Sequence, residues 1–282
     1  MENISGFICL NKPAGMSSAA AVSKVKRATG MACGHMGTLD PMAEGVLPVA
    51  VGNAARLFQY LLEKEKTYRA VFRFGVETDT LDATGTILRE GLPVPTAAAI
   101  ESVLPEFIGN IEQMPPAYSA KSVNGVRAYM LARQGKEVQL KAKTVRINEF
   151  SLVRGEGGSF EFVIRCGGGT YVRSLGRDLA AKLDTCASMT KLVREKSGYF
   201  TLENSIGLDG LADWRSCLIP PDAVFDMPSV DFDGGDAKKL KNGLSLGFTG
   251  KDGLYKLYLD DEFYGIAEVK EGRVRAKAKI CA

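Results

Sequence analysis

This chain of 282 residues contains a single histidine, His35, and that scarcity excludes several kinds of site. Zinc sites built from several histidines, HExxH proteases and iron centres with two histidines and a carboxylate all need more than one imidazole. A serine hydrolase triad would have to use His35, and no GxSxG motif accompanies it. Histidine-based metal centres are therefore excluded, and a small-molecule hydrolase is disfavoured.

Closely spaced cysteines and long apolar runs are also missing. The six cysteines form no CxxC pair, and their wide spacing predicts reduced thiols rather than a disulfide framework. No basic segment precedes an apolar core at the N-terminus, and no apolar run approaches the roughly 20 residues of a membrane span. We therefore expect a soluble, cytoplasmic protein without a membrane partner.

The common cofactor signatures are absent as well. The sequence has no GxxxxGK[ST] loop, and its glycine-rich runs at 155–158 and 167–169 do not complete GxGxxG. The HxE and PCxxC motifs of base deaminases are missing too. No motif in the sequence indicates a metal, nucleotide or redox cofactor.

The charge is nearly balanced overall but unevenly distributed. There are 36 basic and 33 acidic residues, a net charge of +3. Basic residues outnumber acidic ones by seven to two in 119–150, seven to three in 165–196 and five to one in 270–279. Such local excesses can contact phosphates, although randomly clustered, solvated charges explain them equally well. The charge permits a nucleic-acid partner without requiring one.

Strand and helix patterns follow each other irregularly, which predicts an α+β main domain. The strongest strand patterns lie at 6–10, 66–74, 160–166, 254–259, 263–269 and 273–280. The helix patterns lie at 20–27, capped by Ser17 or Ser18, at 95–106 with Thr96 as N-cap, at 127–134 and at 171–183. Prolines precede the last strands, so we expect a main domain over 1–227 and a small β module over 228–282.

Asp40 is the most informative acidic residue. It precedes Pro41, which disfavours a helical conformation for it, and the surrounding glycines allow another molecule to approach the backbone closely. From the residues alone, a turn-forming aspartate and a functional carboxylate both remain possible. For Asp79 and Asp82, an Asp-capped turn is expected over cation binding.

The segment Gly34–Pro48 resembles the GHxGxLDPxAxGxLP catalytic loop of TruB-type tRNA pseudouridine synthases. Further segments resemble that family's KPxGxSS, KxYxA, TDTxDxxG, PPxYSAxK and GTYIRxL motifs in the same order: Gly6–Ser18, Lys66–Ala70, Thr78–Gly85, Gln113–Lys121 and Gly169–Leu175. The resemblance implies a pseudouridine-synthase fold, with a central mixed, largely antiparallel sheet flanked by helices. It also implies that the small C-terminal β module is a reduced PUA-like domain.

The resemblance further implies an isomerase that flips uridine 55 out of the tRNA T loop and converts it to pseudouridine, without cofactor or metal. Asp40 matches the catalytic carboxylate, which acts on the sugar as a nucleophile or as a base. Arg173 matches the arginine that partners this carboxylate. Tyr68 matches the aromatic residue that stacks on the base and serves as general base.

Other positions match residues of the family that contact RNA. His35 matches the histidine that occupies the space left by flipped nucleotides, and the remaining substrate-binding positions are Tyr171, Leu192 and Lys12. Residues 119–150 lie where the family has an RNA-contacting insertion, so phosphate contacts are expected at Lys121, Arg127, Lys141 and Lys143. The implied partner is the T stem-loop of tRNA, bound by a monomer without an obligate protein partner. The alternative is a non-catalytic RNA-binding or tRNA-folding protein on the same scaffold.

Overall fold

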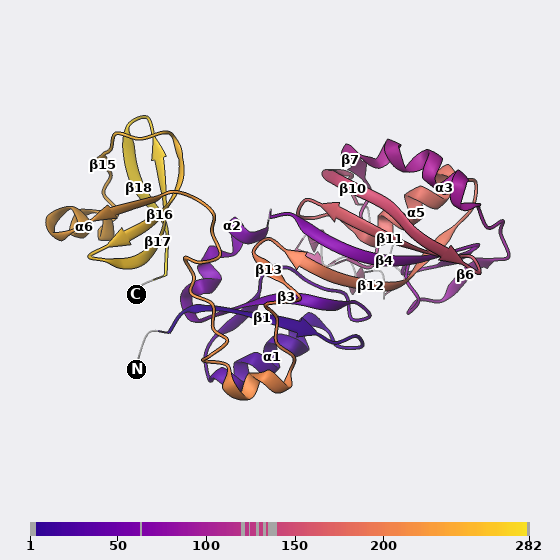
Figure 1. The fold of residues 1–282 in the computed structure, drawn as a ribbon, viewed down its shortest axis with the longest axis horizontal. Coiled ribbons are helices and arrows are strands. Elements are labelled where there is room, and N and C mark those ends of the chain that lie inside the picture. The colour runs from indigo at the N-terminus through magenta and orange to yellow at the C-terminus, as the bar shows by residue number, and fades with distance from the viewer. Residues whose placement is uncertain are drawn as a thin grey trace. The chain divides into compact units, whose positions relative to one another are not determined.

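The computed structural model describes residues 4–62, 64–119 and 140–280, and between the last two ranges 122–123, 125–127, 130–131 and 134. The chain divides into two compact units. The first comprises Met1–Pro41, Gly45–Leu62 and Ser197–Ala282. The second comprises Met42–Glu44 and Glu63–Lys196. Both contain strands and helices (Figure 1).

The first unit opens with antiparallel strands and a capped helix. Its elements up to residue 213 are β1 (Gly6–Lys12), α1 (Ser18–Thr29), β2 (Cys33–His35), β3 (Glu44–Val51), η1 (Gly52–Leu57), α2 (Phe58–Leu62), β13 (Phe200–Thr201) and η3 (Asp209–Asp213). β3 pairs antiparallel with both β1 and β2. The Ser17 side chain accepts from the Ala20 amide at the start of α1, and Gly30 ends the helix in a left-handed conformation. The predicted first strand and the Ser17 cap are confirmed.

The C-terminal residues of the first unit form a five-stranded sheet with one helix. Its elements are β14 (Ser229–Phe232), α6 (Gly234–Lys241), β15 (Leu246–Gly247), β16 (Gly253–Leu259), β17 (Glu262–Lys270) and β18 (Arg273–Lys279). The strand order is β14-β16-β17-β18-β15, in which only β14 and β16 are parallel (Figure 1, yellow end of the colour bar). The three strands predicted here are confirmed.

This C-terminal sheet contributes to two apolar clusters. One lies within the module and includes Leu240 of α6 and Leu257 of β16. The other joins Ile266 and Ala278 to Leu57 and to residues of β1 and β3. Burying a leucine or isoleucine side chain in such a cluster stabilises the fold by about 1.5–3 kcal/mol. The shared cluster therefore packs the module against η1.

The second unit is built on strands in the order β12-β4-β11-β10-β7, and those from β4 to β7 pair antiparallel. The sheet strands are β4 (Lys66–Phe74), β7 (Gly109–Gln113), β10 (Lys143–Glu156), β11 (Ser159–Cys166) and β12 (Ala187–Ser197). Two small hairpins are formed by β5 (Val76–Thr78) with β6 (Ile87–Glu90) and by β8 (Ser122–Val123) with β9 (Val126–Arg127). The helices are α3 (Ala97–Val103), η2 (Leu104–Phe107) and α5 (Val172–Lys182). α3 contacts both α5 and β10 (Figure 1).

The alternation in β4 places Tyr68 and Phe72 on the buried face, as predicted. Phe72 packs against Phe162, with tilted rings whose centroids are 5.4 Å apart. Thr96 caps α3 as predicted. The helix predicted over 127–134 is wrong at its start, because Arg127 pairs with β8 in a hairpin. An Asn-Gly pair separates the two strands in the sequence, and this dipeptide favours a tight hairpin turn. Part of 128–134 lies outside the described residues.

Candidate active site

Asp40 lies in the loop that joins β2 to β3, and the main chain on both sides of it is held. Ser18, buried in the first turn of α1, donates to the Leu39 carbonyl and accepts from the Leu39 amide, each at 2.8 Å. The Pro41 carbonyl accepts from the Gly15 amide at 2.8 Å. All of these bonds involve the main chain of the residues on either side of the half-buried Asp40, so the backbone of its loop is fixed at both ends.

Lys12, at the end of β1, is completely buried. Its Nζ donates to the carbonyls of Pro13 at 2.9 Å, Met16 at 2.7 Å and Pro41 at 3.4 Å. A buried ammonium is costly unless its protons are used in hydrogen bonds. These bonds tie the turn after β1 to the loop of Asp40, and the substrate contact expected of Lys12 stays a prediction.

His35 is the last residue of β2 and is half-buried. It is paired with Val49 of β3, and the amide of the next residue, Met36, donates to the Pro48 carbonyl at 2.8 Å. The histidine thus leads into the loop of Asp40 from a paired strand. Its expected role in base flipping stays a prediction.

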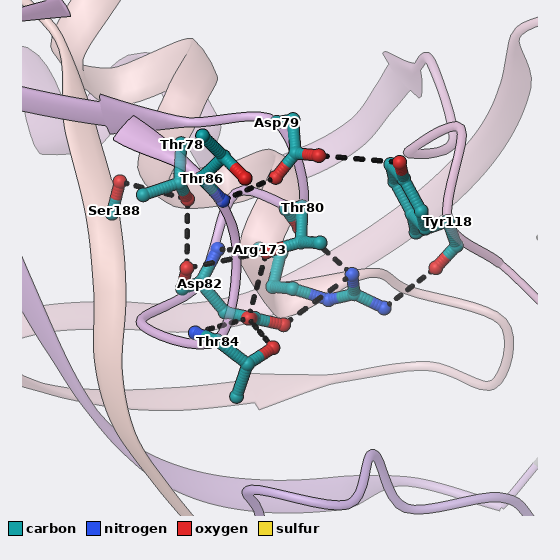
Figure 2. Close-up of polar contacts among 9 residues, drawn as sticks. All are labelled: Thr78, Asp79, Thr80, Asp82, Thr84, Thr86, Tyr118, Arg173 and Ser188. Atoms are coloured by element: carbon teal, nitrogen blue, oxygen red, sulfur yellow. Dashed lines mark hydrogen bonds and ion pairs between the residues drawn. The ribbon is translucent and has the colours of Figure 1, made fainter. Parts of the chain in front are cut away.

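In the second unit, Arg173 lies at the start of α5 within a polar cluster (Figure 2). We define the Arg173 cluster as Thr78, Asp79, Thr80, Asp82, Thr84, Thr86, Tyr118, Arg173 and Ser188. The guanidinium donates from Nη1 to the Thr80 carbonyl at 2.8 Å and from Nη2 to the Tyr118 carbonyl at 3.0 Å. Nη1 also lies 3.5 Å from Oδ2 of Asp82, and both side chains are only 6% exposed. Partners on both nitrogens hold this planar group in one orientation.

Asp82 is held in turn by neighbouring donors. Its Oδ1 accepts from the Thr84 amide at 3.0 Å, the Thr84 hydroxyl at 2.6 Å and the Thr80 hydroxyl at 2.8 Å. Leu81 has φ 61°, a left-handed conformation that costs a non-glycine residue about 1–2 kcal/mol. In this conformation the carbonyl before Leu81 and the carboxylate after it both contact Arg173. The Asp-capped turn is confirmed, whereas the ion pair with Arg173 was not predicted.

Tyr118 links Arg173 to Asp79. Its carbonyl accepts from Arg173, and its hydroxyl donates to Oδ2 of Asp79 at 3.2 Å. Oδ1 of Asp79 accepts from the Thr86 amide at 2.8 Å. A β-carbon at Gly85 would overlap Oδ1 of Asp79 and lie 2.9 Å from the Thr80 amide nitrogen, so the turn requires glycine there. The TDTxDxxG and PPxYSAxK motifs therefore meet at one arginine, which their separate positions in the sequence did not indicate.

Tyr68 and Leu192 lie on the neighbouring strands β4 and β12 and are 7% and 5% exposed. Tyr171 precedes α5, and its main chain is held at two points by the buried Gln113. The Gln113 side chain accepts from the Tyr171 amide at 2.8 Å and donates to the Tyr171 carbonyl at 3.1 Å. Gln113 is thus a positioning residue that sequence reasoning missed, although it begins a motif. The second unit holds Tyr68, Tyr171, Arg173 and Leu192, and the first holds Lys12, His35 and Asp40.

Lys66 begins β4 and points to the same sheet face as Tyr68. Burial, together with the charge of the nearby Arg194, lowers the pKa of Lys66 to about 8. Its partner across the sheet is Cys166, and burial raises the pKa of that thiol to about 11. A lysine with a lowered pKa therefore lies on the strand of Tyr68, and the sequence patterns did not indicate it.

The basic residues expected to contact phosphates are only partly visible. Lys141 precedes β10 and Lys143 begins it, and both are exposed. Arg127 belongs to β9, but its side chain lies outside the described residues, as does the whole of Lys121. The four expected phosphate contacts stay predictions.

No group of three or more His, Cys, Asp or Glu side chains is arranged to hold a metal ion within the part of the chain that the structure describes. In the same part, no helix combines the length and apolar character needed to cross a bilayer. The functional groups that the structure does show are therefore the loop of Asp40, the Arg173 cluster and the buried side chains of β4 and β12.

The fold is that of the pseudouridine synthases. The chain is similar to one in the crystal structure of a Cbf5-Nop10-Gar1 complex, with a TM-score of 0.74, 24% identity, and coverage of 98% of this chain and 85% of that one. A chain of an H/ACA RNP bound to a substrate RNA containing 2′-deoxyuridine matches with a TM-score of 0.73 and 23% identity, covering 98% and 85%. The predicted sheet flanked by helices, with its C-terminal β module, is confirmed.

Similarity in sequence identifies the family of the chain more specifically. Residues 24–172 match the N-terminal domain of the TruB family of pseudouridylate synthases. The tRNA pseudouridine synthase B of Acaryochloris marina is 38% identical over 287 residues, covering 98% of this chain and 99% of that protein. The one of Synechocystis sp. is 42% identical over 252 residues, covering 86% and 85%. The chain belongs to the TruB family of pseudouridine synthases and is an isomerase.

Proposed function

We propose that this enzyme converts uridine 55 in the T loop of tRNA to pseudouridine. Relatives named tRNA pseudouridine synthase B, aligned with as much as 98% of the chain, support a tRNA substrate. The observation that carries the proposal is the loop of Asp40, whose backbone is held by Ser18 on one side and by Gly15 and Lys12 on the other. A carboxylate carried by a loop whose backbone is fixed in this way is preorganised for chemistry.

The substrate and the product of this reaction contain the same atoms. The bond from N1 of uracil to C1′ of the ribose breaks, the base turns, and a bond from C5 to C1′ forms. C5 then loses a proton and N1 takes one, so the product is an isomer. Asp40 acts on the sugar, as the nucleophile or as the base, because an ionised carboxylate can do either without a metal.

Tyr68 stacks on the uracil with its ring and removes the C5 proton with its hydroxyl. Arg173 is oriented by Asp82 and by two carbonyls. It supplies a fixed positive charge that stabilises the ionised catalytic carboxylate in an enclosed site. Tyr171 and Leu192 line the uracil pocket.

The remaining proposed contacts bind and deform the RNA. His35 fills the space of the flipped nucleotide, since extruding a base costs a few kcal/mol unless its stacking is replaced. Lys12, besides holding its loop, contacts the substrate. The four basic residues of the insertion bind T-arm phosphates, which position the RNA without reading its sequence.

The test is Asp40→Asn, assayed for pseudouridine at each position of an unmodified tRNA transcript and of a T-arm minihelix. The variant should bind both RNAs as the parent does, while product formation falls by at least about a thousandfold. Asp226→Asn serves as the control, since it makes the same change at an exposed carboxylate of the same unit.

Undiminished turnover by Asp40→Asn overturns the assignment of the catalytic carboxylate. Product at a uridine other than 55 overturns the proposed position while leaving the reaction class intact. Binding of both RNAs by the parent protein, with no pseudouridine in either, indicates the non-catalytic alternative.

A further inference from the structure

The segment Gln113–Ser119, which leads into the insertion, is tied to the start of α5 within the second unit. The side chain of its first residue binds both main-chain groups of Tyr171. The next carbonyl, that of Met114, accepts from the completely buried Ser174 hydroxyl at 2.9 Å and from Nη2 of Arg177 at 3.0 Å. These bonds fix the segment along the first two turns of α5.

The end of this segment belongs to the Arg173 cluster. The Tyr118 carbonyl accepts from Arg173, and the Tyr118 hydroxyl donates to Asp79. The amide of the next residue, Ser119, donates to the Ala117 carbonyl at 3.0 Å. Ser119 therefore directly follows a residue whose main chain and side chain are both held.

The Ser119 hydroxyl is an exception in this bonded segment. The residue is only 3% exposed, and its buried Oγ has no hydrogen-bond partner in the structure as described. By comparison, the buried hydroxyls of Ser174 and Ser188 in the same unit donate to carbonyls at 2.9 and 3.0 Å. Burying a hydroxyl without a partner costs free energy that the fold does not recover. Such a group in a native fold indicates a role other than stability.

The place of Ser119 in the chain indicates the chemistry that fits its hydroxyl. Ser119 opens the segment 119–150, in which basic residues outnumber acidic ones by seven to two. The first of the proposed phosphate contacts, Lys121, follows it by two positions. Serine hydroxyls often donate to the phosphate and sugar oxygens of nucleic acids. The Ser119 hydroxyl is therefore suited to an oxygen of an RNA backbone.

We propose that the Ser119 hydroxyl binds an oxygen of the sugar–phosphate backbone of the T arm, on a phosphate or on a ribose 2′-hydroxyl. The proposal rests on the proposed function, since the RNA is the tRNA substrate. Ser119 is covered in the structure, so the contact forms when the chain at Ser119 shifts and exposes the hydroxyl. The hydrogen bond that the hydroxyl gains then offsets part of the cost of that shift. Because Tyr118 is already held by Arg173, the contact anchors the RNA beside a fixed point of the site.

The test compares Ser119→Ala with the parent protein on the T-arm minihelix. Kd and KM should each rise about fivefold while kcat changes by less than about twofold, because a backbone contact serves substrate and transition state alike. The slope of log Kd against log salt should stay the same, because the variant removes no charge. Ser102→Ala, at an exposed serine of α3, is the matched control and should change none of these values.

Thermal unfolding separates an RNA contact from a structural role. Ser119→Ala removes the cost of burying its hydroxyl, so Tm should stay the same or rise by about 2 °C. Ser174→Ala removes a buried hydroxyl that is bonded to Met114, so Tm should fall by at least about 2 °C. If Tm of Ser119→Ala falls as far as that of Ser174→Ala, the hydroxyl stabilises the fold and the proposal is overturned.

Modified minihelices separate the two sources of the oxygen. If a phosphorothioate at one position weakens binding by the parent and not by Ser119→Ala, the oxygen belongs to a phosphate. If a 2′-deoxynucleotide at one position does so, the oxygen belongs to a ribose. If neither change does so at any position of the T arm, the proposal is overturned. An unchanged Kd for Ser119→Ala overturns it as well, and so does a smaller salt slope, which indicates displaced cations of the insertion.

Failure of the proposed function is distinguishable from failure of this proposal. If the parent protein makes no pseudouridine in the minihelix or in tRNA, the assigned reaction fails, while Kd for the minihelix still reports on Ser119. If pseudouridine forms normally at uridine 55 and Kd is insensitive to Ser119→Ala, only the Ser119 proposal fails.

Discussion

Asp40 and Arg173 carry opposite charges and are held by opposite means. Around Asp40, the hydrogen bonds of Ser18 and Gly15 go to the main chain of the flanking residues. Around Arg173, the partners contact the guanidinium itself, and Asp82 places a second charge beside it. One region fixes a backbone and the other fixes a side chain.

At Asp40, a substitution of the side chain is expected to affect the reaction more than the stability of the fold. At Arg173, a substitution of a partner is expected to affect both. Replacing the Asp40 carboxylate leaves the main-chain bonds of its loop in place. Replacing a partner of Arg173 leaves a buried charge with less compensation, which destabilises the fold as well as the site. The predictions below test that contrast, from the largest expected effect to the smallest.

Asp82→Asn should reduce the free energy of unfolding by about 3 kcal/mol, because the buried Arg173 would lose the charge of the Asp82 carboxylate. Asp40→Asn should reduce it by less than that, because the bonds of Ser18 and Gly15 to its loop go to the main chain and remain. Urea unfolding followed by circular dichroism measures both. The double variant Asp82→Asn/Arg173→Met should recover part of the loss, since it removes both charges. Equal stability of the two single variants would contradict the contrast.

Ser18→Ala should lower the free energy of unfolding by about 1–2 kcal/mol, because both polar groups of Leu39 lose their buried partner. We also expect kcat to fall with little change in KM, since the loop of Asp40 becomes less well placed. Ser23→Ala is the control, an exposed serine of the same helix that bonds only to the Ala19 carbonyl. Similar losses in both variants would argue against a specific role for Ser18.

Lys66 extends the comparison to a cation that can lose its charge. Its pKa is lowered to about 8 by burial, so between pH 8 and the usual lysine range the unfolded chain binds more protons than the folded one. Stability should therefore rise with pH from about 8 to 9, and Lys66→Met should lack this rise. The measurement stays below pH 9, because burial raises the pKa of Cys166 to about 11. Above pH 9 the unfolded thiol loses its proton before the folded one, which lowers stability as the pH rises. A rise of equal size in Lys66→Met would assign it to another group.

Within the Arg173 cluster, Tyr118→Phe should have a small effect, a loss of less than about 1 kcal/mol of unfolding free energy. It removes the hydroxyl bond to Asp79 but keeps the carbonyl that accepts from Arg173. Activity should fall by a few-fold at most. A loss as large as that of Asp82→Asn would show that the hydroxyl, and not the carbonyl, holds the Arg173 cluster together.

Much of the local structure was predictable because its signals are local. The alternation of Lys66–Phe74 and the cap at Ser17 depend on residues within a few positions of each other, and both are confirmed. The helix expected from Arg127 was wrong at its start because the helical pattern was weighed above the Asn-Gly turn signal. For the candidate site, motif resemblance selected Asp40, Tyr68 and Arg173, whose roles stay predictions.

Contacts between residues far apart in the sequence could not be predicted from local patterns. Asp82 and Arg173 are separated by 91 positions, and Gln113 and Tyr171 by 58, so no periodicity connects either pair. The left-handed Leu81 was also unpredictable, since its own preference is for other conformations and only the surrounding bonds hold it there.

By itself, the sequence determined the family, the strand and helix patterns, the carboxylate before Pro41 and the basic excess near the C-terminus. The tertiary structure alone decided which bonds hold the loop of Asp40, which carboxylate pairs with Arg173 and which groups bind the segment Gln113–Ser119 to α5. The reason is physical. Local patterns follow from backbone sterics and side-chain periodicity, whereas these contacts form only when packing brings distant segments together and excludes water from between them.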